Sequence, residues 1–269
     1  MKKTLFAIAT LLLAAGLVMV SCQKPADGNK EGNALIDDEP SDNPGGEETP
    51  GGEETPGDTT PASLKGSNYY LIQLDGTTAE SIADKVVADY RPDGQGKNLW
   101  VWEGTYNGGT ASGLNFFGLT EGWVCLDVVA GPGWSGAGWQ VNNKEGLAPD
   151  FLKMKDLATD TDKYYLHVAY KGVKNVAHIL GFGYGSNNEY KFAVGEGSLG
   201  DAGVDYPAIA PINNGGTFDS REWNEYEVKL SDMGLDFTRD ITDANVFFCL
   251  SGGVGGTQIN LDAIFVYKK

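Results

Sequence analysis

Residues 258–267 read Gln-Ile-Asn-Leu-Asp-Ala-Ile-Phe-Val-Tyr, and residues 223–230 read Trp-Asn-Glu-Tyr-Glu-Val-Lys-Leu. Each is a short apolar or alternating run rich in β-branched and aromatic side chains, which is typical of a strand. Similar runs occur near residues 69–74, 98–103, 123–129, 139–141, 164–170, 177–183, 190–194 and 245–250. Connectors rich in Gly, Asn, Pro and Asp separate them, and the chain holds 38 glycines. This succession of short strands predicts an all-β sandwich or barrel.

One segment, residues 79–90, has a helical pattern. Ile82, Val86 and Tyr90 recur there at four-residue spacing, behind a pair of threonines that are candidate caps. A second short helical turn is expected over residues 149–156. We therefore expect a β-sandwich with one short helix.

The first 21 residues have the layout of a signal peptide. Lys2 and Lys3 precede an almost unbroken apolar run over residues 5–20. Ser21-Cys22 then places a small residue directly before a cysteine, which resembles the lipobox of bacterial lipoproteins. The resemblance implies cleavage before Cys22, acylation of its thiol and attachment to a membrane through this lipid. The alternative is an ordinary secreted protein in which Cys22 has no such role.

Residues 22–61 form an acidic segment with almost no aliphatic or aromatic side chains. The six-residue repeat Pro-Gly-Gly-Glu-Glu-Thr starts at Pro44 and again at Pro50, and residues 23–61 carry eleven Asp or Glu against two Lys. Such a segment cannot bury enough apolar surface to offset its chain entropy, so we expect a disordered, extended linker. Residues 62–269 are long enough for one large folded domain.

The charge of the chain argues against some partners. The formal net charge is −17; without Lys2 and Lys3 it is −19, of which residues 23–61 carry −9 and the remainder −10. An acidic domain with scattered Lys and Arg lacks the clustered positive charge that binding to phosphate backbones needs, so nucleic acid is not expected as a partner. The same charge disfavours electrostatic adhesion to anionic lipid and favours a neutral ligand or a cation.

Two cysteines remain after Cys22. Cys125 and Cys249 each lie within a strand-like run. An exported protein can form disulfides, so one interpretation pairs these two residues. The other interpretation is that both are small, buried apolar residues.

The strand patterns near the C-terminal end resemble those of a known family. Residues 223–232 and 259–267 are similar to the closing strands of a galactose-binding-like jelly roll, an arrangement found in many carbohydrate-binding modules. Residues 98–106 and 133–139 are similar to segments of surface lipoproteins from Gram-negative polysaccharide-utilisation systems. The resemblance implies a jelly-roll β-sandwich that binds glycan at the outer surface of the outer membrane, beside an outer-membrane glycan transporter.

The resemblance also implies a structural calcium ion. Asp262 matches the position at which the last strand of the family supplies a carboxylate, and Asp75 is the candidate for a further oxygen ligand. The alternative is that Asp262 accepts hydrogen bonds from a nearby turn.

Aromatic residues are the candidates for glycan binding, because flat sugar faces stack on indole and phenol rings while amides and carboxylates bind hydroxyl groups. Trp134 and Tyr184 lie in Gly-rich loops where burial is hard to arrange, and Asn187 offers an amide close to Tyr184. Trp100 and Trp102 share one face of a predicted strand, so they are either core packing or a platform on the sheet face. The other tryptophans are expected in the core: Trp123, Trp139 and Trp223.

Catalytic signatures are not found in the sequence. The chain has only two histidines, no Gly-x-Ser-x-Gly elbow and no phosphate-binding loop. A pair of carboxylates from distant strands, such as Glu103 and Asp127, is the remaining route to a glycosidase. We therefore predict a non-catalytic surface lipoprotein that captures polysaccharide or oligosaccharide for uptake. The alternatives are a glycoside hydrolase or lyase on the same fold, and a structural or adhesive surface protein.

Overall fold

The computed structural model describes residues 59–269. The expected signal peptide over residues 1–21, the expected lipidation site Cys22 and most of the acidic linker lie outside the described residues. In the part of the chain that the structure describes, no helix is both long enough and apolar enough to cross a bilayer.

Fourteen strands and a few short helical segments make up the described chain. The strands are β1 (Ser67–Gln73), β2 (Val86–Asp89), β3 (Lys97–Val101), β4 (Tyr106–Leu114), β5 (Thr120–Val128), β6 (Ser135–Asn142), β7 (Tyr164–Gly172), β8 (His178–Gly183), β9 (Glu189–Val194), β10 (Ser198–Asp201), β11 (Val204–Pro207), β12 (Asn224–Lys229), β13 (Asp243–Ser251) and β14 (Gln258–Lys268). The helical segments are α1 (Gly76–Ser81) and the 3₁₀ helices η1 (Ala62–Leu64), η2 (Ala83–Lys85), η3 (Pro149–Thr159), η4 (Asn214–Gly216) and η5 (Leu230–Asp232).

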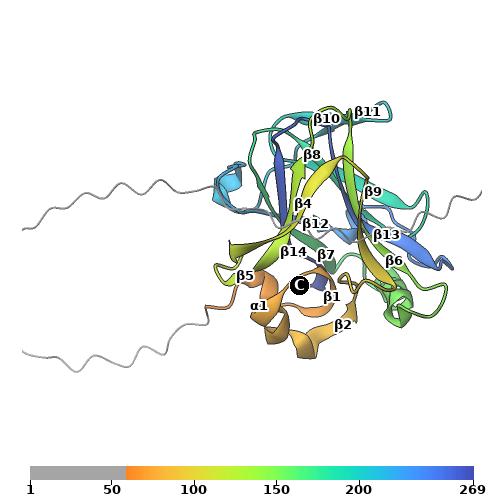
Figure 1. The fold of residues 1–269 in the computed structure, drawn as a ribbon. Coiled ribbons are helices and arrows are strands. Elements are labelled where there is room, and N and C mark those ends of the chain that lie inside the picture. Colours follow the sequence, from red (N-terminus) through yellow and green to blue (C-terminus); the bar gives the residue numbers. More distant parts are fainter. Residues whose placement is uncertain (1–58) are drawn as a thin grey trace, which may run out of the picture.

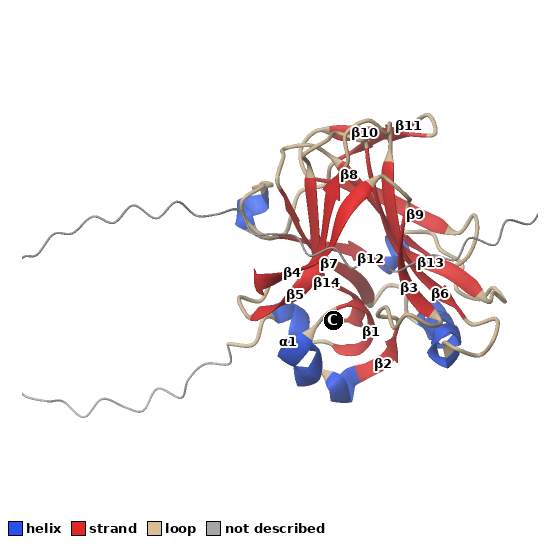
Figure 2. Cartoon of the chain, in the orientation of Figure 1, coloured by secondary structure: helices blue, strands red, loops and turns tan. Residues whose placement is uncertain are grey.

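The strands form two sheets that face each other, as Figures 1 and 2 show. Sheet A has seven strands, in the order β12-β7-β14-β1-β2, with β5 added to β14 and β4 to β5. Sheet B has five strands, in the order β3-β6-β13-β8-β9. The β10–β11 hairpin forms a separate pair near the top of Figure 1. The expected all-β sandwich is confirmed, and α1 is its one α-helix within residues 59–269.

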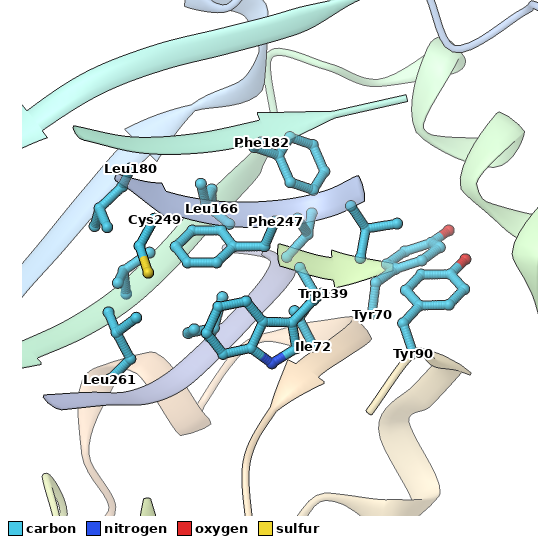
Figure 3. Packing of buried hydrophobic residues seen from close by; sticks show 14 of the residues in the cluster. Tyr70, Ile72, Tyr90, Trp139, Leu166, Leu180, Phe182, Phe247, Cys249 and Leu261 are labelled. Atoms are coloured by element: carbon cyan, nitrogen blue, oxygen red, sulfur yellow. The ribbon is translucent and has the colours of Figure 1, made fainter. Parts of the chain in front are cut away.

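The core lies between the two sheets (Figure 3). Trp139 on β6 and Phe247 on β13 meet edge to face with ring centroids 5.3 Å apart. The Trp139 indole N–H donates to Oε1 of Gln73 at 3.3 Å, which satisfies the one polar atom of a side chain that is 1% exposed. Burial of a large apolar side chain of this kind contributes about 1.5–3 kcal/mol. Trp139 is therefore a core residue, as expected.

A second hydrophobic cluster covers the outer face of sheet A. Tyr69 on β1 stacks on Tyr267 of β14 at 5.6 Å, and Phe265 of β14 stacks on the His167 ring at 4.6 Å. Buried side chains from η1 and α1 pack onto the same cluster. Sheet A is therefore covered on both faces, by sheet B on the inside and by these short helices on the outside.

The expected helix over residues 79–90 is wrong in extent. The α-helix ends at Ser81, and Val86–Asp89 form strand β2, which runs parallel to β1. The apolar residues at four-residue spacing do not form one helix face, since Ile82 packs in the outer cluster and Tyr90 in the main core. All ten predicted strands are present, as is a helical turn at residues 149–156, which forms part of η3.

Candidate functional site

The outer face of sheet B carries the candidate site. A shallow cavity of about 300 Å³ lies on this face, and we call it the sheet-face groove. Its lining residues come from β3 and the residue after it, and from β6, β13, β9 and β10: Trp100, Trp102, Ala137, Gly138, Glu189, Lys191, Asp201, Asn245, Phe248 and Leu250. The strand register places Trp100, Gly138, Phe248, Gly181 and Lys191 opposite one another in a row that crosses all five strands. The groove therefore runs across the strands rather than along them.

Two tryptophans form the apolar end of the groove. Trp100 is 53% exposed and Trp102 is 45% exposed. Leu99 and Val101 pack against the core, so the strand alternation sends the two indoles to solvent on the same face. Positions two residues apart in a strand are about 7 Å apart, so the indoles are neighbours on the surface. The core-packing alternative for Trp100 and Trp102 is therefore wrong, since both indoles face solvent.

Glycines let the aromatic rings of the groove lie against the sheet. A methyl group added at Gly136 would lie 2.7 Å from Cε2 of Trp102. A methyl group added at Gly181 would lie 1.9 Å from Cζ of Phe248. Neither position leaves room for any side chain beneath the ring, so the two glycines are required by the close approach of the aromatic rings.

The opposite end of the groove is polar. Nζ of Lys191 lies 2.7 Å from Oδ2 of Asp201, which the β10–β11 hairpin brings over this face, and 5.9 Å from the centre of the Phe248 ring. The hydrogen bond to Asp201 raises the pKa of Lys191, so the ammonium group stays charged at neutral pH. Glu189 and Asn245 add a carboxylate and an amide to the lining. The groove thus combines a flat apolar end with a hydrogen-bonding end.

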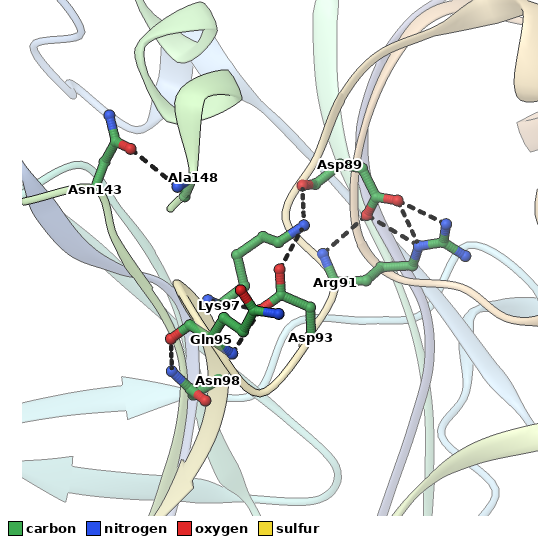
Figure 4. A network of polar contacts seen from close by, with 8 residues as sticks. All are labelled: Asp89, Arg91, Asp93, Gln95, Lys97, Asn98, Asn143 and Ala148. Atoms are coloured by element: carbon green, nitrogen blue, oxygen red, sulfur yellow. Dashed lines mark hydrogen bonds and ion pairs between the residues drawn. The ribbon is translucent and has the colours of Figure 1, made fainter. Parts of the chain in front are cut away.

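A polar network fixes strand β3 and hence the two tryptophans (Figure 4). Nζ of Lys97 donates to the carbonyl of Asp89 at 3.2 Å and lies 3.2 Å from Oδ2 of Asp93. Oδ1 of Asp93 accepts from the backbone N–H groups of Gln95 at 2.9 Å and Lys97 at 3.1 Å. These contacts close the turn between β2 and β3, so the edge strand that bears Trp100 is held from its first residue.

The groove can bind a ligand that has both a flat apolar face and polar groups at its edge. An exposed indole buries apolar area when such a face stacks on it. Carboxylate, amide and ammonium groups a short distance away can accept from or donate to hydroxyl groups. The charged lining consists of Glu189, Asp201 and Lys191, with a net charge of −1, so a neutral ligand is better suited than a polyanion.

The other predicted glycan-binding residues lie away from the groove. Tyr184 was expected to be exposed; this is wrong, because its side chain is 0% exposed and packs against Phe151 and Phe237 in the core. Asn187 is exposed in the β8–β9 turn with a positive φ of 57°, and Trp134 is half-buried in the loop before β6. Neither of these two residues lines the groove.

Asp262 and Asp75 were expected as ligands of a structural calcium ion, and the contacts of Asp262 are protein hydrogen bonds. Oδ1 and Oδ2 of Asp262 accept backbone N–H groups from Ala263 at 2.7 Å and Phe116 at 3.0 Å, so the hydrogen-bonding alternative is confirmed. Burial raises the pKa of Asp262 to about 6, and burial also raises the pKa of Asp75. Over residues 59–269, no group of three or more His, Cys, Asp or Glu side chains is arranged to hold a metal ion.

Cys125 and Cys249 are not joined by a disulfide. Both are buried, as the second interpretation held. On β5 the neighbours Val124 and Leu126 point into the core, so alternation sends Cys125 to the opposite face, whereas Cys249 on β13 belongs to the core itself. The disulfide pairing is wrong because one thiol lies outside the sandwich interior and the other inside it.

The two histidines have structural surroundings. His167 is wholly buried, with Nδ1 2.7 Å from the carbonyl of Ala263 and Nε2 3.0 Å from Oε1 of Glu225. His178 is also buried, and its Nδ1 lies 2.5 Å from the Tyr170 hydroxyl. Neither ring lines the sheet-face groove. Of the two carboxylates considered for catalysis, Glu103 lies in the turn after β3 and Asp127 accepts a hydrogen bond from Gln258.

Several lining residues were not singled out from the sequence, namely Glu189, Lys191, Asp201, Asn245 and Phe248. A signal was present, because Lys191 alternates with apolar neighbours in the run 190–194 and so had to face solvent. The glycines at positions 181 and 183 within a strand pattern also indicated a close approach of another group. Neither pattern predicts the strand order of sheet B, which places β9 at one edge of the face and β3 at the other.

Comparisons with known proteins find similar solved structures but do not assign this chain to a family. No protein-family model matches the chain, and no curated protein matches it. A family 30 carbohydrate-binding module from a cellulosomal cellulase of Clostridium thermocellum is 14% identical over 65% of this chain and 92% of its own, with a TM-score of 0.40. A family 61 module solved with β-1,4-galactotriose is 9% identical over 65% of this chain and 90% of its own, with a TM-score of 0.35. An exo-β-agarase is 9% identical over 75% of this chain and 25% of its own, with a TM-score of 0.40. Overlaps of this size establish neither a family nor a ligand for this chain.

Proposed function

We propose that this protein binds a polysaccharide or oligosaccharide in the sheet-face groove and does no chemistry on it. The observation that carries the proposal is the pair of solvent-facing indoles, Trp100 and Trp102, beside a hydrogen-bonding end formed around Lys191 and Asp201. Stacking on flat C–H faces and hydrogen bonding to hydroxyl groups are the two interactions that a sugar chain requires. The net acidic groove and the acidic domain favour an uncharged glycan.

The cellular role that we propose follows from the N-terminal sequence. Acylation of Cys22 would anchor the chain in the outer membrane, on the side that faces the cell exterior. The acidic segment over residues 22–61 would hold the domain at a distance from the membrane. From that position the domain would capture glycan and pass it to an outer-membrane transporter. Incorporation of labelled palmitate into the wild type, its loss in Cys22→Ser, and digestion of the domain by protease added to intact cells would support this location. An unlabelled wild type, or a domain protected on intact cells, would contradict it.

Binding is tested by affinity electrophoresis and calorimetry of the domain over a panel of plant, host and microbial polysaccharides. Removal of a central tryptophan from an interface typically costs about 2 kcal/mol or more. Trp100→Ala and Trp102→Ala are therefore each expected to weaken binding roughly thirtyfold. Trp134 lies outside the groove, so the Trp134→Ala variant is expected to bind glycan as the wild type does. No retardation by any glycan, or loss of binding in Trp134→Ala alone, would contradict the groove, and release of shortened products would contradict the non-catalytic role.

A glycine pair gives a finer test of the platform. In Gly136→Ala the new methyl group overlaps the Trp102 ring and must lift it from the sheet, whereas Gly133 has no heavy atom within 4 Å of a new methyl group. Neither glycine has a positive φ, so alanine fits the backbone at both positions. We expect weaker glycan binding in Gly136→Ala and unchanged binding in Gly133→Ala, at equal melting temperatures. Equal affinities in the two variants would show that the position of Trp102 does not matter.

A further inference from the structure

A second cavity, of about 560 Å³, lies in the loop that precedes β12. We call it the loop pocket, and its lining residues are Asn175, Asn214, Thr217, Phe218, Asp219, Ser220, Arg221 and Glu222. It shares no lining residue with the sheet-face groove. We propose that the loop pocket is a separate sugar site that takes a single polyhydroxylated ring, such as the end or a branch of a glycan. This site does not depend on whether the groove binds ligand.

The loop around the pocket is built to hold one shape. Asn224 is 0% exposed and its amide group makes five hydrogen bonds within the loop and to β7. Asn213 adds two more, donating to the carbonyl of Trp223 at 3.0 Å and accepting the N–H of Glu225 at 2.8 Å. A loop that is fixed before binding loses little conformational entropy when a ligand arrives.

Phe218 supplies an apolar surface inside the pocket. Its ring centre lies 6.0 Å from that of Tyr170, with the planes inclined at 31°, so its position is set by the core. Phe218 is half-buried and lines the cavity, so part of the ring remains available to a ligand. One aromatic ring can stack against one sugar ring.

The polar groups around Phe218 are largely unused. In the described part of the chain, the side chains of Asn175, Thr217, Ser220 and Glu222 line the pocket and are absent from every side-chain hydrogen bond and ion pair that the domain makes. An amide, two hydroxyls and a carboxylate together offer both donors and acceptors. Sugar hydroxyl groups need both, because each one donates and accepts.

The charges of the pocket select against an anion. Arg221 donates to both oxygens of Asp219 at 3.0 Å and 2.8 Å, and this hydrogen bonding lowers the pKa of Asp219 to about 2. The pair is thus mutually satisfied, and Glu222 leaves the lining with a net formal charge of −1. A phosphate or a sulfated sugar would face that carboxylate, whereas a neutral sugar would not.

The test follows the domain's backbone amide signals by NMR during titration with a panel of methyl glycosides. It uses the Trp100→Ala/Trp102→Ala variant, so that the sheet-face groove does not contribute. We expect at least one methyl glycoside to shift the signals of residues 214–222. Adding Asn175→Ala and Ser220→Ala, two surface changes outside the Asn224 hydrogen bonds, is expected to weaken that binding at least tenfold. Asn187→Ala, in the distant β8–β9 turn, serves as the matched control.

Two outcomes would overturn the loop pocket. One is that no methyl glycoside shifts residues 214–222 in the Trp100→Ala/Trp102→Ala variant. The other is a shift that Asn175→Ala and Ser220→Ala leave unchanged, because the proposed donors and acceptors would then play no part. Failure of the groove has a different signature, namely polysaccharide binding that is indifferent to Trp100→Ala and Trp102→Ala in an otherwise wild-type domain.

Discussion

The outer faces of the two sheets both carry aromatic side chains, which are buried on sheet A and exposed on sheet B. On sheet A, Tyr69, Phe265 and Tyr267 are at most 1% exposed beneath η1 and α1. On sheet B, Trp100 and the adjacent Trp102 are about half exposed and line an open groove. Aromatic residues on the outer face of a sheet therefore do not by themselves indicate a binding site. The presence or absence of a covering segment decides their role.

Connectivity explains why only one face is covered. β1 and β2 are parallel neighbours in sheet A, so the chain between them must cross over one face of the sheet. That crossover contains α1 and η2, which lie on the outer face. All pairs in sheet B are antiparallel and need no crossover of this kind. The open groove on sheet B is thus a consequence of its strand order.

The largest expected effect is a difference in the free energy of unfolding between variants of the covered face and of the open face. Phe265→Ala removes a wholly buried ring and is expected to lower the free energy of unfolding by about 3–5 kcal/mol. Trp100→Ala removes a half-exposed ring with no cover and is expected to change it by less than about 1 kcal/mol. Urea denaturation of the two variants measures both values. Similar losses in the two variants would contradict the distinction between a covered face and an open one.

The next effect is a pH dependence that follows from the burial of one carboxyl group in sheet A. Asp262 lies on the covered side, and burial raises its pKa to about 6 from an ordinary value near 3.8. The folded state then binds more protons than the unfolded state between these values, so this group lowers stability as pH rises from about 4 to 6. The shift corresponds to at most roughly 3 kcal/mol.

Asp262→Asn is expected to remove that slope. The amide oxygen can still accept the Ala263 N–H, while the contact with Phe116 N–H is lost. The measurement is the difference in free energy of unfolding between wild type and variant at pH 4, 5, 6 and 7, which cancels the titration of other carboxylates. A difference that is constant with pH would show that burial does not perturb this carboxyl group.

The sequence predicted the elements better than the site, and the reason is the range of the interactions. The run 98–103 was recognised as a strand from its own residues, because alternation is local. β2 was missed because its strand state depends on parallel pairing with β1. The Gly-rich loop predicts an exposed Tyr184, but Phe151 and Phe237, from distant segments, pack against its ring. The polar end of the groove likewise depends on the pairing of β9 and the position of β10.

A smaller effect is expected from the floor of the groove. In Gly181→Ala the new methyl group overlaps the Phe248 ring, which must move outward, and overpacking of this kind costs about 1–3 kcal/mol. At Gly200 the same change meets only the carbonyl of Val204 at 3.7 Å, an ordinary contact. We expect Gly181→Ala to lower both the melting temperature and glycan affinity, and Gly200→Ala to change neither. Equal behaviour of the two variants would mean that the Phe248 ring does not need the glycine beneath it.

The smallest expected effect is that of a reducing agent, which should leave the melting temperature unchanged. Cys125 and Cys249 lie on opposite faces of their sheets and are not bonded to each other. Burial also raises the pKa of Cys249 to about 12, so its thiol is a poor nucleophile in the folded protein. Mass spectrometry after brief treatment with iodoacetamide should therefore find Cys249 unmodified until the domain unfolds. If urea below the unfolding midpoint exposes Cys125 to the reagent before Cys249, the outer side of β5 opens more easily than the sandwich interior. Simultaneous labelling of both thiols would instead show that the outer side of β5 and the interior open as one cooperative unit. A lower melting temperature under reduction would contradict the placement of the two cysteines.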